Sequence, residues 1–275
     1  RRRVLIIAQP FAQPAGLLPM VLFKLVGQCQ QQAPGSKWVS EQTAFGRITY
    51  TSKKPDRMDA DRGREWFIMT KHSGGSRTLT AHCEIDDPPP VIRDVSLSVG
   101  SDWRPHDSSV RLTVGGNFMG SAWFRFSDQE VECQAFTVNE GRLDQRVATT
   151  ERPKGFGNHA IASDGWLLNC YDLSKGPGTQ FLEDMMLSSS DHRGATGPII
   201  FQLGFGIEYV GEEKCAVRAG TFNALHFRIV GTEGQLPEPP PPYDMWCTAD
   251  GDYILLRGSV TGYMMTHYEL VELQR

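Results

Sequence analysis

The stretch Arg77-Thr78-Leu79-Thr80-Ala81-His82-Cys83-Glu84-Ile85 shows the alternation that decides the fold class. Successive side chains of a β-strand point to opposite faces, so a period of two residues is typical of a half-buried strand. The same alternation resumes after the turn residues Asp86–Pro90 and continues from Val91 to Val99. One face of the first stretch is apolar and consists of Leu79, Ala81, Cys83 and Ile85.

Further strand-like segments lie on both sides of this stretch. We count about eleven to thirteen of them at a spacing of roughly 8–14 residues, with few helical patterns between them. Such a series favours a mostly antiparallel sheet and argues against a doubly wound parallel fold, which needs regular alternating helices. The sequence therefore predicts a mainly β protein, built as a strongly curved antiparallel sheet or barrel of half-barrel or lipocalin-like type.

Two segments have a helical pattern instead. Residues 19–31 begin with Pro19, which suits the first turn of a helix, and carry an apolar stripe at three- and four-residue spacing. This pattern predicts a helix that packs on the sheet. A second, short helix is predicted from Thr179 to Leu187. The expected organisation is an N-terminal segment with its helix, residues 1–37, and a single β-barrel-like domain, residues 38–275.

Composition restricts the class of partner. Of the 275 residues 40% are hydrophobic and 22% charged, which is typical of a soluble globular protein. The net charge of −4 argues against nucleic acid, and no apolar run approaches the ~18 residues that a spanning helix needs. Arg1-Arg2-Arg3 and the apolar residues 4–8 resemble the start of a secretory signal, but Gln9 and Pro10 interrupt it. We expect a cytoplasmic protein, with a secreted or periplasmic one as the alternative; a homo-oligomer is compatible with the sequence.

The six cysteines are scattered through apolar runs, without a CxxC pair, and we expect all of them to be reduced. The sequence contains no nucleotide-binding glycine loop and no HExxH or GxSxG motif, and no two of its seven histidines have metal-ligand spacing. The sequence thus predicts chemistry without a cofactor or a metal.

The candidate site is the stretch Lys154–Trp166, which holds two glycines, His159, Asp164 and two aromatic residues without a regular period. Irregular segments of this kind carry special backbone geometry or a site. His159 and Asp164 are placed to reach one another across a tight loop, with Trp166 and Tyr171 on a strand that follows. A purely structural loop, in which the aspartate caps backbone amides, explains the same residues.

The C-terminal third resembles known families through short motifs. These motifs are Ala219-Gly220-Thr221-Phe222 with a strand to Val230, then Trp246-Cys247-Thr248 and Tyr268-Glu269-Leu270. They look like the end of uncharacterised half-barrel proteins similar in fold to bacterial lipoprotein carriers, and they also resemble lipocalin-like hydratases or cyclases. Either resemblance implies a cavity for a hydrophobic small molecule and transfers no catalytic residue.

Two functions follow as hypotheses. The first is a cofactor-independent lyase or isomerase, of the dehydratase, hydratase or isomerase type, acting on a hydrophobic small molecule. In it His159 moves a proton, Asp164 orients it, and Tyr171 or His106 supplies a second acid. The alternative is a non-catalytic carrier for a lipid or another apolar ligand. Polar and aromatic residues on strands are the candidates for binding that molecule, although alternation does not say which face they occupy: Arg111, Trp123, Arg125, Trp166, His226 and Arg228.

Overall fold

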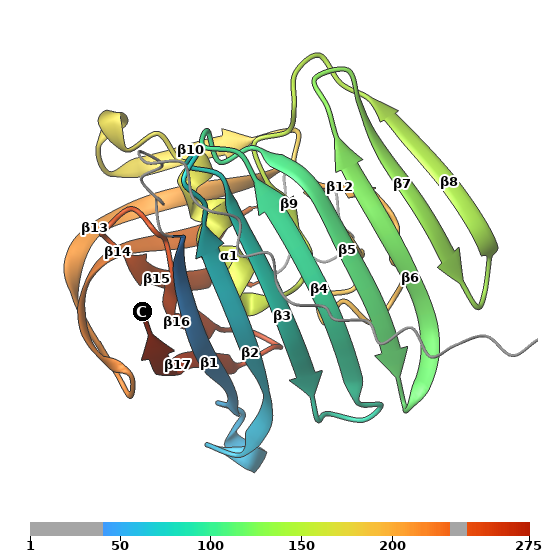
Figure 1. Ribbon diagram of the computed structural model, residues 1–275. Coiled ribbons are helices and arrows are strands. Elements are labelled where there is room, and N and C mark those ends of the chain that lie inside the picture. The colour runs from blue at the N-terminus through green and yellow to red at the C-terminus, as the bar shows by residue number, and fades with distance from the viewer. Residues whose placement is uncertain (1–40, 232–240) are drawn as a thin grey trace, which may run out of the picture. The chain divides into compact units, whose positions relative to one another are not determined.

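The computed structural model describes residues 41–231 and 241–275, all within one compact unit, Val39–Arg275. Fourteen strands form one antiparallel sheet in the order β10-β13-β14-β15-β16-β17-β1-β2-β3-β4-β5-β6-β7-β8 (Figure 1). The helix predicted at residues 19–31 lies outside the described residues. The strands are β1 (Gln42–Ser52), β2 (Asp61–Lys71), β3 (Arg77–Ile85), β4 (Val91–Val99), β5 (Pro105–Val114), β6 (Asn117–Phe126), β7 (Glu130–Thr137), β8 (Gly141–Ala148), β10 (Gly178–Leu182), β13 (Phe205–Val217), β14 (Gly220–Val230), β15 (Tyr243–Thr248), β16 (Leu255–Val260) and β17 (Thr266–Gln274).

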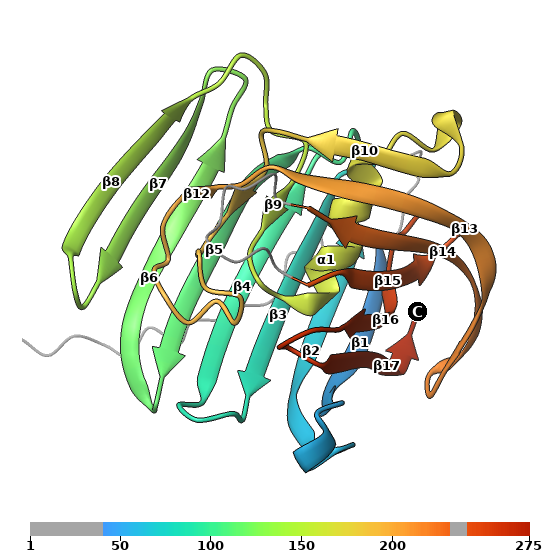
Figure 2. The same cartoon turned by 180° about the vertical axis from the view of Figure 1, so that it is seen from behind.

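The sheet is curved and barrel-like but not closed. The first and last strands of the series pair with each other, β1 with β17, and this pairing joins the two halves of the sheet. The two ends of the strand order, β10 and β8, are not paired with one another. The curl brings β14–β16 to face β2–β4 across a single helix, α1 (Ile161–Leu167), as Figures 1 and 2 show. The prediction of a mainly β protein built on one large, curved antiparallel sheet is confirmed, and the sheet does not close into a barrel.

The prediction of a helix from Thr179 to Leu187 is wrong. Thr179–Leu182 belong to strand β10, which pairs with β13 from Gly178↔Tyr209 to Leu182↔Phe205. The apolar residues Phe181, Leu182, Met185 and Met186 mimic a helical spacing, but β13 offers an open edge and the ladder prevails over the local pattern. Met186 and Leu187 form β11, which pairs with β9 (Phe156–Gly157) and β12 (Phe201–Gln202) in a separate three-stranded sheet.

The only α-helix in the described part of the chain, α1, lies in the stretch for which no regular period was found. Gly165 hides the helical pattern, because glycine is unfavourable inside a helix. The structure shows why glycine is used there: a Cβ at this position would be 2.3 Å from the backbone oxygen of Tyr253. Short 3₁₀ turns follow at Leu168–Cys170 and Leu173–Lys175, so Trp166 and Tyr171 do not lie on a following strand as predicted.

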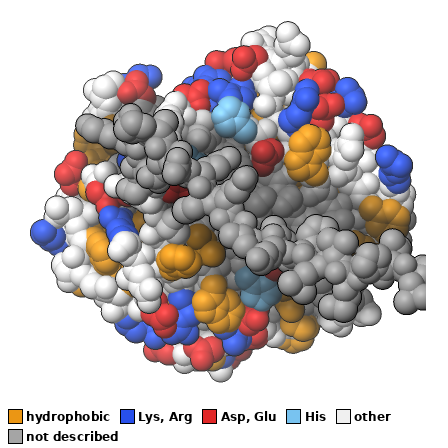
Figure 3. Space-filling view, viewed as in Figure 1, with side chains coloured by type: hydrophobic (Ala, Val, Ile, Leu, Met, Phe, Trp, Pro, Cys, Tyr) orange, Lys and Arg blue, Asp and Glu red, His pale blue; other side chains and the backbone are white. Residues whose placement is uncertain are grey.

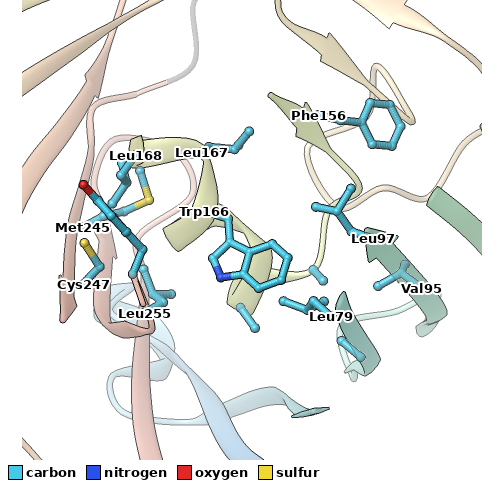
Figure 4. Packing of buried hydrophobic residues seen from close by; sticks show 14 of the residues in the cluster. Leu79, Val95, Leu97, Phe156, Trp166, Leu167, Leu168, Met245, Cys247 and Leu255 are labelled. Carbon is cyan, nitrogen blue, oxygen red and sulfur yellow. The ribbon is translucent and has the colours of Figure 1, made fainter. Parts of the chain in front are cut away.

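Trp166 occupies the centre of the core. It is 5% exposed and lies between the labelled side chains of the two sheet halves: Leu79 and Leu97 on one side, Met245 and Leu255 on the other (Figure 4). The alternating strand residues fill the rest of the same cluster, as the period of two predicted. The described cysteines, Cys83, Cys133, Cys170, Cys215 and Cys247, are all free, in agreement with the predicted reduced state; Cys29 lies outside the described residues.

Candidate functional site

Helix α1 is held at its start by a carboxylate from a distant strand. Glu65 of β2 is fully buried, and its two carboxylate oxygens accept the backbone N–H groups of Ile161 and Ala162, each at 2.8 Å. The Tyr50 hydroxyl and the Cys83 thiol also donate to it, at 2.8 and 3.2 Å. The first N–H groups of a helix have no partner within the helix, so Glu65 fixes the position of α1 against the sheet.

A buried arginine fixes the segments on the other side of the site. Arg93 of β4 is 1% exposed and donates to the backbone oxygens of Asn158 and Gly194 and to the Ser188 hydroxyl. These three acceptors come from segments that are far from β4 in the sequence. Burial lowers the pKa of the Arg93 guanidinium to about 10, so it remains a cation at neutral pH.

His159 follows Asn158, which Arg93 binds, and precedes Ile161, which Glu65 binds, in the sequence. Its φ of 64° is in the left-handed region, which a non-glycine residue rarely occupies and which costs on the order of 1–3 kcal/mol. Its Nε2 lies 3.1 Å from the Ser189 backbone oxygen, a geometry that suits an Nε2–H donor. Burial, with a further contribution from the Arg93 charge, lowers the pKa of His159 to about 3. The imidazole is therefore neutral at pH 7.

Asp164 lies one turn further along, on α1. The Tyr243 hydroxyl, from β15, donates to its Oδ2 at 3.3 Å. Burial, together with the nearby Glu65 carboxylate, raises the pKa of Asp164 to about 8, and the tyrosine bond opposes this only in part. The side chain is thus mainly a neutral carboxylic acid at pH 7, able to donate a hydrogen bond.

His159 and Asp164 both line an apolar cavity of about 530 Å³ inside the curl of the sheet. This volume is within the range of roughly 300–1,000 Å³ that small-molecule sites occupy. Its walls come from α1, from the segments around β11 and β12, and from β13–β17. Apolar side chains form most of them, among them Leu167, Leu187, Phe201, Leu203, Phe205, Ile229, Met245 and Val260. We call this space the apolar cavity.

A second, smaller cavity adjoins the first. It has a volume of about 240 Å³, and six residues line both spaces: His159, Ile161, His192, Tyr263, Met264 and Tyr268. Its own lining includes Lys54, Arg62, Arg93 and Arg193. We call this space the basic cavity.

The structure brings together two of the four predicted catalytic residues. His159 and Asp164 share the apolar cavity, although no hydrogen bond joins them in the described structure. Tyr171 uses its hydroxyl to donate to the backbone oxygens of Gly176 and Gly178, outside that cavity. His106 is exposed, contacts Arg152 and does not line that cavity.

The predicted binding residues lie elsewhere. Arg111, Trp123 and Arg125 are exposed on β5 and β6, where they alternate with buried neighbours and thus face away from the core. His226 and Arg228 lie on β14 and both contact Asp244. Trp166 belongs to the core. Figure 3 shows basic, acidic and hydrophobic side chains interspersed over the described surface in that view, which is typical of a solvated face.

Sequence reasoning missed Glu65, Arg93 and Tyr243. Each is a polar residue at an inward position of a strand: Glu65 and Arg93 are buried and Tyr243 is half-buried. A charged residue that interrupts the apolar face of an alternating strand is the signal that could have found the first two, since buried charges are rare without a partner.

Comparison with known proteins supports the fold alone. No family model and no curated protein matches the chain. Among solved structures, it is similar to a beta-barrel-like protein of a domain of unknown function, DUF1849, from Brucella abortus, with a TM-score of 0.55 and 10% identity over 84% of this chain and 96% of that one. A DUF1089 family protein from Pseudomonas aeruginosa gives a TM-score of 0.40 and 8% identity over 72% and 89% of the two chains.

Two further features are absent from the described residues. They contain no group of three or more His, Cys, Asp or Glu side chains placed to hold a metal ion. No helix among them is long and apolar enough to cross a bilayer.

Proposed function

We propose that the protein binds a hydrophobic small molecule in the apolar cavity, with Asp164 and Tyr243 orienting it. The observation that carries this proposal is the composition of the wall: a space of about 530 Å³ with a mostly apolar lining and polar groups, Asp164 and Tyr243 among them, at its edge. A ligand site needs such an apolar body and a small number of placed polar groups. Because Asp164 is mainly protonated at pH 7, it can donate a hydrogen bond to an oxygen of the ligand.

Hydrogen bonds from buried side chains hold the supporting residues in place, which favours binding without a large ordering cost. Glu65 fixes the start of α1, and Arg93 fixes the segment that ends at Asn158. These bonds position Asp164 and His159 before any ligand arrives. The backbone strain at His159 is what a position held for a site would show.

Calorimetric titration with 1-dodecanol tests the proposal. The Ile229→Trp substitution places a larger side chain in the cavity wall on β14 and is expected to weaken binding at least roughly tenfold. Val210→Trp is the matched control, because Val210 on neighbouring β13 is 42% exposed and does not line the cavity. Equal binding by both variants and the parent, or no binding by the parent, would refute the proposal.

A second candidate is catalysis of the lyase or isomerase type, and the Asp164 pKa of about 8 favours it. A carboxyl group that titrates near neutral pH in an apolar space is suited to general acid–base chemistry. His159, with a pKa of about 3, is neutral throughout this range and contributes a hydrogen bond rather than a proton.

Incubation of trans-2-dodecenoate with the protein in heavy water distinguishes catalysis from binding. A hydratase or isomerase adds water or deuterium to the chain, which mass spectrometry detects, and Asp164→Asn is expected to lower that rate by roughly 10²–10⁴. Tight binding with no mass change would leave the carrier as the function.

A further inference from the structure

The basic cavity has an unusual charge balance. Four cationic side chains line it, Lys54, Arg62, Arg93 and Arg193, and no carboxylate does so among the described residues. His159 and His192 complete its polar lining, together with the hydroxyls of tyrosine and threonine side chains. Buried or half-buried cations normally have an acidic partner close by, and only some of these four have one.

Two of the four have a carboxylate partner that does not line the basic cavity. Arg62 forms an ion pair with Asp87, and it also donates to Thr266. Arg193 is 4.0 Å from Asp191, whose Oδ1 is already engaged by the backbone N–H groups of Arg193 and Ala195. The charge of Arg193 is therefore only partly balanced.

The other two form no ion pair with a described residue, although the charge of Asp191 also acts on Arg93. Arg93 is 1% exposed, its acceptors are two backbone oxygens and one hydroxyl, and its Nε–H has no hydrogen-bond partner in the described structure. Lys54 forms no ion pair with any described residue; its neighbour Lys53 does, with Asp59 at 2.5 Å. A buried guanidinium that forms no ion pair is costly, and an anion in the cavity would lower that cost.

The four cations also act on the two histidines that line the cavity. Burial lowers the pKa of His192, and the charges of Arg193, Arg62 and Lys54 lower it further, against the opposing effect of Asp191. Burial and then the Arg93 charge act in the same direction on His159. Both histidines line both cavities.

We propose that the ligand is an amphiphile with an oxyanion head group, which occupies the basic cavity while its apolar part occupies the apolar cavity. This inference rests on the proposed binding function and adds the chemical class of the ligand. The six residues common to both linings place the two spaces side by side, and the proposal requires one molecule to extend from one space into the other. Guanidinium and ammonium groups form their strongest hydrogen bonds with anionic oxygens, such as those of a carboxylate or a phosphate.

The experiment compares ligands with one chain and different heads. Calorimetric titration uses dodecanoate, dodecyl phosphate and 1-dodecanol, with acetate and inorganic phosphate as heads without a chain. The parent is expected to bind the two charged amphiphiles at least roughly tenfold more tightly than the alcohol, a difference of about 1.4 kcal/mol. Acetate and inorganic phosphate are expected to bind far more weakly than their amphiphiles, because they leave the apolar cavity unused.

Substitutions locate the effect. Lys54→Gln is expected to weaken binding of the preferred amphiphile roughly five- to tenfold and to leave dodecanol binding unchanged. Lys53→Gln is the matched control: it removes the same charge from the adjacent residue, which does not line either cavity, and is expected to change nothing. Lys54 is preferred to Arg93 as the site of change, because Arg93 also ties three chain segments together.

The outcomes separate the two proposals. If dodecanol binds as tightly as the charged amphiphiles, and Lys54→Gln has no effect, the oxyanion proposal is overturned while the binding function stands. If inorganic phosphate binds as tightly as dodecyl phosphate in a Lys54-dependent way, the site takes a free anion and the amphiphile is refuted. If none of the chain-bearing ligands binds the parent, both proposals are wrong.

Discussion

Replacing Asp164 by asparagine is expected to remove a pH dependence of stability that the parent protein has above pH 4. The folded protein raises the pKa of Asp164 to about 8, mainly through burial, whereas an unfolded aspartate titrates near 3.9. As pH rises, the unfolded chain loses this proton first. The folded state then holds more protons than the unfolded state, and the free energy of unfolding falls.

The magnitude follows from the window between the two pKa values. Each pH unit inside it lowers the free energy of unfolding by about 1.4 kcal/mol, so the two units from pH 5 to 7 correspond to about 3 kcal/mol. Asparagine keeps the shape and a hydrogen-bonding group but carries no proton to lose. The difference in stability between Asp164→Asn and the parent should therefore grow in favour of the variant by about this amount over the window.

Urea unfolding at pH 5, 6 and 7, followed by tryptophan fluorescence, measures the difference directly. Asp184→Asn is a useful control, since Asp184 is an exposed aspartate outside the apolar cavity. A constant difference between the Asp164 variant and the parent across this range would show that Asp164 is already ionised in the folded protein. The carboxylic acid assigned to the cavity would then be wrong.

Two other substitutions test the supporting network. Glu65→Ala leaves the N–H groups of Ile161 and Ala162 and the Tyr50 hydroxyl without their shared acceptor. We expect the free energy of unfolding to fall by more than about 3 kcal/mol. A loss below about 1 kcal/mol in urea unfolding would contradict the role of Glu65 in fixing α1. His159→Gln tests stability in acid. The pKa of His159 is about 3 in the folded protein, below the value near 6.5 in the unfolded chain. The free energy of unfolding of the parent therefore falls by about 1.4 kcal/mol for each pH unit as pH falls through that window. The glutamine variant should lack this loss, whereas His106→Gln, on the exposed surface, should retain it; identical acid profiles for all three proteins would refute the assignment.

The period of two residues was sufficient to predict the sheet, because side-chain alternation depends only on the local chain and on one buried face. Arg77–Ile85 and Val91–Val99 are both strands with the predicted boundaries. The same local logic failed at Thr179–Leu187, where pairing with β13 determines the structure of the chain. It also failed at α1, because the close approach of Gly165 to Tyr253 and the cap from Glu65 are contacts between residues far apart in the sequence.

The candidate site was predictable only in part for the same reason. His159 and Asp164 were found because they lie close together in a segment rich in special residues. Tyr243, Glu65 and Arg93 come from three different strands, and only the curl of the sheet brings them to that segment. The strand residues chosen for binding were assigned without knowledge of which face is inside, and Arg111, Trp123 and Arg125 lie on the exposed one.

The most direct test of the central claim is a crystal structure of the protein with 12-bromododecan-1-ol, in which anomalous scattering locates the bromine. The binding function predicts a bromine peak inside the curl of the sheet, bordered by α1 and by β13–β16, near Leu167, Phe205 and Met245. The exposed apolar side chains of Phe45, Trp66 and Ile68 line a groove outside the apolar cavity and offer the competing location. A peak in that groove, with the apolar cavity empty, would contradict the claim.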